Sequence, residues 1–196
     1  MKKIMLCALA LLATLTVSAQ VFTYTTRIGN FNGPVKTVLS SSDMGVTVDY
    51  YTPDGRLEKS LNSTKDEYTL FSWEKGIIIQ KFYNNSTDEF QGESAIGYVS
   101  DEESFMCLTT EVCYYWDFED SILFNLSPDG ETVVWYMATE NKTSTGYDSI
   151  VYVDYKPVSQ TKVKTYDPDE HGNYTRIVTI TSDGVEHERL VSYEYY

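Results

Sequence analysis

The stretch that decides the fold runs from Thr165 to Tyr196 and reads TYDPDEHGNYTRIVTITSDGVEHERLVSYEYY. Two glycine dipeptides, His171-Gly172 and Asp183-Gly184, bracket the run from Arg176 to Thr181, which alternates with a period of two and is rich in β-branched residues. Such a run between turn dipeptides is typical of a β-strand with a tight turn at each end. The stretch therefore predicts antiparallel hairpins.

The rest of the chain repeats this pattern less regularly. Two stretches, Thr52-Pro53-Asp54-Gly55 and Ser127-Pro128-Asp129-Gly130, combine a proline that presets its own backbone angle with a glycine that takes a positive one. The strongest hairpin signal in the first half is the pair of β-prone runs Tyr68 to Trp73 and Ile77 to Tyr83. The aromatic and β-branched run from Phe105 to Trp116 predicts one further continuous strand.

No window after the first nineteen residues shows a helical stripe over three turns. About a dozen short strands linked by turns predict an all-β fold. We expect antiparallel hairpins or a meander that form an open curved sheet, a sandwich or a partial barrel, with few or no helices.

The N-terminus predicts export. Lys2 and Lys3 precede an apolar run that ends in the small residues Val17-Ser18-Ala19, as in a signal peptide. We expect residues 1–19 to be removed and residues 20–196 to form one β-rich domain in the periplasm, at the cell surface or outside the cell. Acylation at Cys7 is an alternative, but this cysteine lies near the start of the apolar run rather than after it. No later stretch has the length and apolarity of a membrane span.

The charge of the chain disfavours one class of partner. The formal net charge is −14, with 29 acidic and 15 basic side chains. A field of this sign repels phosphate backbones, so we expect no nucleic-acid binding. Solubility outside the cell explains the charge, and attraction of cations or a basic partner is the alternative.

Two cysteines follow the predicted signal peptide, Cys107 and Cys113. In one continuous strand they would lie about 20 Å apart, beyond bonding reach. A turn at Thr109 to Glu111 would bring them face to face across a hairpin, but these residues include none of the usual turn formers. We favour free thiols.

No motif in the sequence indicates catalysis. The two histidines, His171 and His187, lie in a turn and on a charged strand, and there is no G-x-S-x-G. The acidic residues Asp167, Asp169 and Glu170 resemble the start of a calcium loop but lack its final bidentate glutamate, so they predict a solvated turn, with surface calcium as the alternative. We expect a protein that is not an enzyme, without catalytic residues, cofactor or resident metal.

The chain is rich in aromatic residues, with 17 tyrosines, 8 phenylalanines and 3 tryptophans. On strands, such residues pair across the sheet and fill the core, which is the interpretation we favour. The alternative is an aromatic platform for a ligand. Its candidate residues are Tyr114, Trp116, Trp135 and Tyr136. Because adjacent residues of a strand face opposite sides, only about half of this densely aromatic region can share one surface.

Several short patterns together resemble the YD repeats of RHS-type secreted bacterial proteins and of small exported bacterial proteins of unknown function. They are Tyr166-Asp167, Gly172-Asn173-Tyr174-Thr175 and Tyr193-Glu194-Tyr195, with related patterns between residues 33 and 57. The resemblance covers residues 33–57 and 165–196 and implies a structural scaffold of strands and Gly-Asn turns without catalytic residues.

These observations predict an exported, non-catalytic scaffold or protein-interaction module. A carbohydrate-binding module with exposed aromatic residues is the first alternative, and a small hydrolase is the second. The partner would accordingly be a protein or a glycan.

Overall fold

The computed structural model describes residues 29, 31–100, 103–109 and 111–196. The predicted signal peptide, the alternative acylation site at Cys7 and the start of the predicted mature chain lie outside this part. The described residues form strands and turns, without a helix. The fourteen strands are β1 (Val35–Ser42), β2 (Gly45–Tyr51), β3 (Leu57–Asn62), β4 (Glu67–Glu74), β5 (Ile77–Asn84), β6 (Phe90–Ser100), β7 (Ser104–Leu108), β8 (Cys113–Asp117), β9 (Ile122–Leu126), β10 (Val133–Thr143), β11 (Gly146–Val153), β12 (Lys156–Pro168), β13 (Tyr174–Ile180) and β14 (Glu186–Tyr195).

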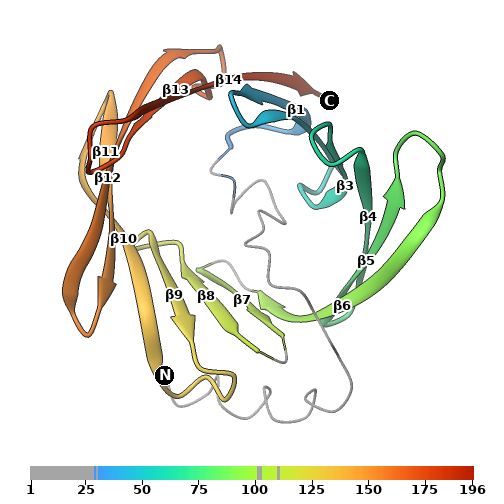
Figure 1. The fold of residues 1–196 in the computed structure, drawn as a ribbon, viewed down its shortest axis with the longest axis horizontal. Coiled ribbons are helices and arrows are strands. Elements are labelled where there is room, and N and C mark those ends of the chain that lie inside the picture. The colour runs from blue at the N-terminus through green and yellow to red at the C-terminus, as the bar shows by residue number, and fades with distance from the viewer. Residues whose placement is uncertain (1–28, 30, 101–102, 110) are drawn as a thin grey trace.

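The strands form one closed antiparallel barrel in which each strand pairs with its neighbours in sequence (Figure 1). The last strand closes the ring by pairing with the first, in a register that places Val38 opposite Tyr193 and Leu39 opposite Ser192. The predicted all-β, antiparallel fold is confirmed, but the predicted open sheet, sandwich or partial barrel is wrong. Closure gives both terminal strands a hydrogen-bonding partner and leaves no open edge.

The inner face of the barrel carries the main hydrophobic core. The segment before β1 lies on the inner side of the ring in Figure 1, and the ring of Phe31, which belongs to this segment, packs on Tyr51 and Tyr193. The alternation of strand residues then places the other members of this core cluster on the same inner face. Its buried members are Val35, Val38, Tyr51, Leu57, Phe71, Ile78, Ile96, Phe105, Cys107, Tyr114, Leu123 and Val191.

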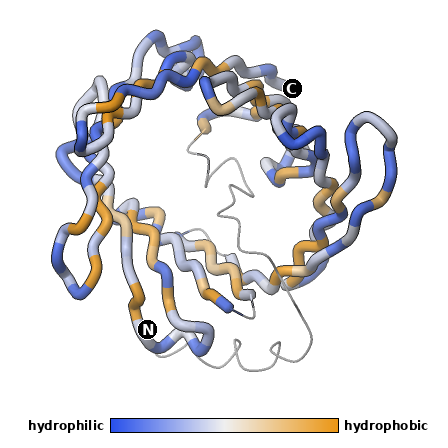
Figure 2. Tube along the Cα trace, viewed as in Figure 1, coloured by the Kyte–Doolittle hydropathy of each residue, from blue (hydrophilic) through white to orange (hydrophobic). Residues whose placement is uncertain are grey.

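A barrel of this size is wide. Eight strands leave an interior that side chains just fill, and sixteen or more leave a channel. With fourteen strands, the wall alone does not pack across the centre as a small barrel does. Figure 2 shows hydrophobic positions along the strands of the ring, whereas the hairpin ends are mostly hydrophilic.

Three hairpins share one turn geometry. Thr52, Ser127 and Thr181 each accept, at the backbone carbonyl, a hydrogen bond from the glycine three residues later, at 2.7 to 2.9 Å. The hydroxyl of each of the three also bonds the aspartate two residues later. The glycines have φ between +73° and +84°, a region that favours glycine. The two predicted Pro-Asp-Gly turns are therefore confirmed, as is the turn predicted at Asp183-Gly184.

The predicted continuous strand from Phe105 to Trp116 is wrong, because the chain turns back between β7 and β8. Thr109 supplies the turn that glycine or asparagine supplies elsewhere. Its buried hydroxyl accepts from the backbone amides of Glu111 and Val112, at 3.2 and 3.0 Å. The same hydroxyl donates to the carbonyl of Val112, at 3.1 Å. Hydrogen bonds of a threonine side chain thus stabilise a turn that lacks the usual turn-forming residues.

One carboxylate faces inward among the apolar residues. Asp49 of β2 lies opposite Val38 of β1 and Ser60 of β3. Burial raises the pKa of Asp49 above 3.8, although the Ser60 hydroxyl, which donates to Asp49 Oδ1 at 2.6 Å, acts in the opposite direction. The inner face is therefore mixed rather than wholly apolar.

The described residues form no apolar helix of the length needed to cross a bilayer.

Candidate functional site

Six aromatic side chains from β4 to β10 form a nearly continuous line on the inner face, which we call the inner aromatic row. Its members are Trp73, Tyr98, Phe105, Tyr114, Trp116 and Trp135. Successive ring centroids lie 5.3 to 6.3 Å apart. Each contact is within the range of favourable aromatic pairing. The row therefore stabilises the barrel wall over about half of its strands.

The tryptophans hold the row in place and remain partly exposed. Trp73 Nε1 donates to the carbonyl oxygen of Leu57 at 2.7 Å, which fixes the indole across β3 and β4. Trp116 and Trp135 both contact the ring of Tyr114, a buried residue between them. All three indoles pack against the hydrophobic core and are intermediate in exposure.

Three of the four candidate residues predicted from the sequence come together in this row. They are Tyr114, Trp116 and Trp135. Tyr136, the fourth, is on the opposite face of β10, because it is adjacent to Trp135 and side chains alternate along a strand. This split agrees with the expectation that only about half of this aromatic region can share one surface.

Tyr136 belongs instead to a second set on the outside of the barrel, the outer aromatic ladder. The ladder is made of Tyr115, Phe124, Tyr136 and Tyr152, which lie directly opposite one another on β8 to β11. Tyr136 and Tyr152 stack face to face, with centroids 4.7 Å apart and planes 7° apart. Rings that cover each other's faces do not offer those faces to a ligand.

The inner row is also not a flat platform. Trp73 meets Tyr98 at 77°, and Phe105 meets Trp116 at 64°. Binding a sugar by stacking needs a ring face that lies open and parallel to the sugar. Of the ring pairs that make up the inner row, Tyr98 and Phe105 are the near-parallel one, at 13°.

Both described cysteines are free and buried, as favoured from the sequence. The β7–β8 register places Leu108 opposite Cys113 and Cys107 opposite Tyr114, so the two thiols point to opposite faces of the wall. Burial raises the pKa of Cys107 to about 12 and that of Cys113 to about 11. Thiols with such pKa values are poor nucleophiles at neutral pH.

The two histidines lie in different elements and make different contacts. His171 is in the turn between β12 and β13, and His187 is near the start of β14. The ring of His171 packs on Tyr195, with centroids 4.0 Å apart. His187 Nδ1 lies 3.1 Å from Asp43 Oδ2, and both side chains are well exposed. Among the described residues, no serine or threonine hydroxyl bonds either imidazole, so the arrangement that the hydrolase alternative predicted is not formed there.

The Gly-Asn turn near the C-terminus ties the barrel together at its seam. Asn173, which is 3% exposed, donates from Nδ2 to the Asn32 carbonyl at 2.8 Å and to the Tyr195 hydroxyl at 2.7 Å. Its Oδ1 accepts from the Asn32 amide at 2.7 Å. The Tyr195 hydroxyl donates in turn to Asp169 Oδ2. These four residues, Asn32, Asp169, Asn173 and Tyr195, form what we call the seam cluster.

The seam cluster accounts for the acidic stretch that resembled a calcium loop. Desolvation alone would raise the pKa of Asp169, but hydrogen bonds from Tyr195 and from turn amides outweigh it and hold the pKa below 3.8. The neighbouring Asp167 and Glu170 are exposed. No group of three His, Cys, Asp or Glu side chains suited to a metal converges within the described residues.

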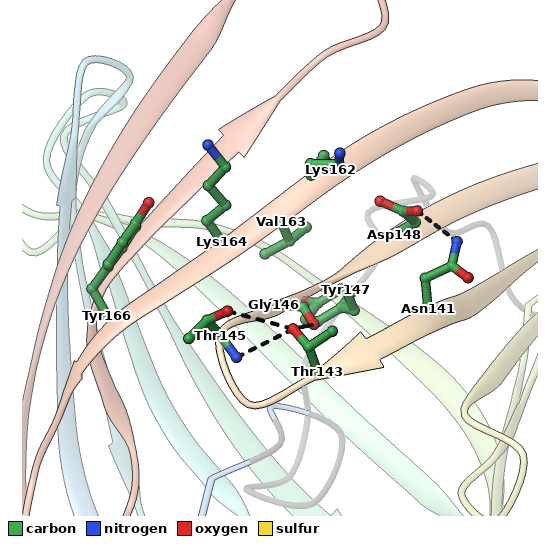
Figure 3. Close-up of a pocket in the computed structure, with 10 residues that line it drawn as sticks. All are labelled: Asn141, Thr143, Thr145, Gly146, Tyr147, Asp148, Lys162, Val163, Lys164 and Tyr166. Carbon is green, nitrogen blue, oxygen red and sulfur yellow. Dashed lines mark hydrogen bonds between the residues drawn. The ribbon is translucent and has the colours of Figure 1, made fainter.

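Sequence reasoning missed a hollow of about 510 Å³, which we call the outer hollow (Figure 3). It lies at the β10–β11 turn and the adjoining part of β12. Its lining residues are Asn141, Thr143, Thr145, Gly146, Tyr147, Asp148, Lys162, Val163, Lys164 and Tyr166. The alternation Lys162-Val163-Lys164 was the one signal in the sequence, since it predicts two lysines on one face of a strand.

No protein-family model matches this chain, and neither a curated protein nor a solved structure is significantly similar to it.

Proposed function

We propose that this chain is an exported, non-catalytic barrel scaffold that binds a protein partner, in the manner implied by its resemblance to YD-repeat proteins. The observation that carries the proposal is the inner aromatic row, in which tryptophan and tyrosine rings pack on one another within the core. Aromatic residues used in this way stabilise a wall rather than a catalytic centre.

Exposed apolar side chains on adjacent strands favour a protein as the partner. They include Val134 on β10, Tyr155 in the turn after β11 and Val158 on β12. Tyr155 is 82% exposed and lies next to the rings of the outer aromatic ladder, 6.2 Å from Tyr136. Strongly exposed apolar and aromatic side chains on the surface of a soluble domain favour a protein–protein contact site.

The test is affinity capture with residues 20–196 as the bait. The proteins offered to the bait are the exported proteins of the organism that makes this chain. The scaffold role predicts saturable capture of a protein, which Tyr155→Ser combined with Val158→Ser weakens at least tenfold. Met44→Ser is the matched control, because Met44 is 80% exposed on the distant β1–β2 turn. If the variant with Tyr155→Ser and Val158→Ser captures the protein as well as the parent does, the partner does not bind at this surface.

A panel of chromogenic glycosidase, esterase and peptidase substrates tests the proposal that the chain has no catalytic activity. The proposal predicts no turnover above that of the heat-denatured chain. Turnover that His187→Ala or His171→Ala abolishes would contradict the proposal and favour the hydrolase alternative.

A further inference from the structure

The outer hollow concentrates positive charge on a strongly acidic protein. Lys162 and Lys164 alternate with Val163 on β12, and Figure 3 shows both ammonium-bearing side chains on one side of the strand, with Val163 on the other. Neither lysine forms an ion pair with a carboxylate of the described residues. On a chain of net charge −14, two unpaired cations side by side are not explained by folding.

The neighbours of Lys164 leave its ammonium without a protein counter-charge. Across the sheet, Lys164 lies opposite Gly146 on β11 and Val178 on β13, neither of which is charged. Gly146 cannot be replaced by a larger residue, since a Cβ there would lie 2.1 Å from the carbonyl oxygen of Val163. The glycine thus allows the β12 backbone to approach β11 closely beside this lysine, and it places no side chain opposite Lys164.

Lys162 lies opposite Asp148, but the two side chains form no ion pair, and the carboxylate bonds Asn141 instead. Asp148 is 8% exposed, and its Oδ2 accepts a hydrogen bond from Asn141 Nδ2 at 2.7 Å. Asn141 lies at the irregularity in the β10–β11 register, where its backbone adopts a positive φ of 50°. The amide and carboxylate form a fixed donor and acceptor pair at the wall of the hollow.

The remaining lining combines hydroxyl groups with one aromatic ring. Thr143 and Thr145 lie at the β10–β11 turn, where the Thr143 hydroxyl donates to the Gly146 carbonyl at 3.0 Å. Tyr166 ends the hollow along β12, and the Arg176 guanidinium lies 4.8 Å from the centre of its ring. Ammonium groups, an amide, a carboxylate, hydroxyls and a ring are the groups that recognise an acidic sugar.

We propose that the outer hollow binds a sugar that carries one carboxylate, such as a uronic acid. The sugar carboxylate lies between Lys162 and Lys164, and the sugar hydroxyls bond Asn141, Asp148 and the threonines. The volume of about 510 Å³ is within the range of small-molecule sites. The acidic charge of the whole chain disfavours polyanions at the same place, so a single carboxylate fits better than a chain of phosphates. This site is independent of the scaffold role and of the inner aromatic row.

The test is an NMR titration of residues 20–196 with glucuronate, glucose and acetate in parallel. We expect glucuronate to bind and to shift the amides of β11 and β12, with at least tenfold weaker binding of glucose and of acetate. The glucose arm tests the need for the charge, and the acetate arm tests the need for the sugar ring. Equal binding of glucose, equal binding of acetate or no binding of glucuronate at tens of millimolar would each overturn the proposal.

Matched variants locate the site. Lys164→Met and Lys162→Met remove a charge and keep an apolar side chain, and each should weaken glucuronate binding about tenfold, as expected for one charge-assisted hydrogen bond. Lys156→Met is the control, because Lys156 is an exposed lysine at the start of the same strand, outside the hollow. Circular dichroism confirms the fold of each variant. Unchanged binding in both hollow variants, or equal weakening in the control, would contradict the assignment.

Discussion

At the scale of single residues, the seam cluster shows how one side chain connects distant parts of the chain. Asn173 joins the β12–β13 turn to the segment before β1 and to Tyr195 of β14. All three hydrogen bonds are at least partly buried, so no water replaces them at low cost.

Asn173→Ala should therefore lower the free energy of unfolding by about 2 to 4 kcal/mol, since it removes a nearly fully buried side chain and all three of its hydrogen bonds, two of them to the backbone of Asn32. Urea denaturation followed by circular dichroism measures the change. Asn85→Ala, at an exposed position, is the control and should change stability by less than about 0.5 kcal/mol. A loss below 1 kcal/mol for Asn173→Ala would mean that the seam cluster does not stabilise closure.

A second prediction concerns the inward carboxylate of Asp49. Its folded-state pKa is raised, so the folded state disfavours the ionised form, and this cost is present at neutral pH and disappears as the pH falls below about 3.8. Asp49→Asn keeps an acceptor for the Ser60 hydroxyl and removes the charge. We expect the variant to be more stable than the parent at pH 7 and equal to it near pH 3, as measured by urea midpoints at both values. A variant that is less stable at pH 7 would show that the charge at Asp49 is compensated.

Residue-level features divide into those that the sequence reveals and those that it does not. The Gly-Asn turn at Asn173 was visible as a motif, but its partner Asn32 is far away in sequence, and only closure brings the two together. Likewise, alternation placed Tyr114 and Trp116 on one face, whereas their contact with Trp135 depends on the register between β8, β9 and β10.

At the scale of elements, turns with glycine were predictable and the turn without it was not. The Ser127 and Thr52 turns carry residue types whose backbone preferences dictate the geometry. Thr109 builds its turn from a side-chain hydroxyl, a signal too weak to read against a strongly β-prone run. The split of the predicted strand into β7 and β8 follows from that one residue.

Thr109→Val tests this account of the β7–β8 hairpin. Valine keeps the shape and removes the hydroxyl, so two partly buried hydrogen bonds from the turn amides lose their acceptor, and we expect a loss of about 1 to 3 kcal/mol in unfolding free energy. Thr109→Ser retains the hydroxyl and should lose markedly less. If the serine variant is as unstable as the valine variant, the methyl group rather than the hydroxyl explains the turn.

Gly130→Ala tests the shared turn geometry without any steric contact. Nothing lies within 4 Å of a Cβ at this position, yet φ is +73°. We expect a loss of about 1 kcal/mol from the backbone conformation alone, and a smaller loss for Gly130→Asn, since asparagine tolerates this region better. Thermal denaturation of the two variants side by side measures the difference, and equal stability of Gly130→Ala and the parent would contradict the positive φ.

At the scale of the whole molecule, the order of strands follows the order of the sequence, as in a meander, which was one of the expected arrangements. Closure was not predictable in the same way. No local pattern in Val35–Ser42 or Glu186–Tyr195 specifies that the first and last strands pair, because strand pairing at long range depends on the accumulated twist and curvature of all the strands between them. The ring also determines which aromatic residues face inward together.

Closure of the ring is the central claim, and a disulfide across the seam tests it most directly. Leu39 and Ser192 lie opposite each other on β1 and β14 and are both exposed, whereas the native thiols Cys107 and Cys113 are buried. Leu39→Cys with Ser192→Cys should form an intramolecular disulfide under mild oxidation, and the bond should raise the unfolding free energy by up to about 5 kcal/mol, because the loop that it closes exceeds about 100 residues. The control pair Leu70→Cys with Ser192→Cys, on strands far apart in the barrel, should form none. A Leu39–Ser192 pair that stays reduced, or that cross-links no faster than the control pair, would contradict the closed barrel.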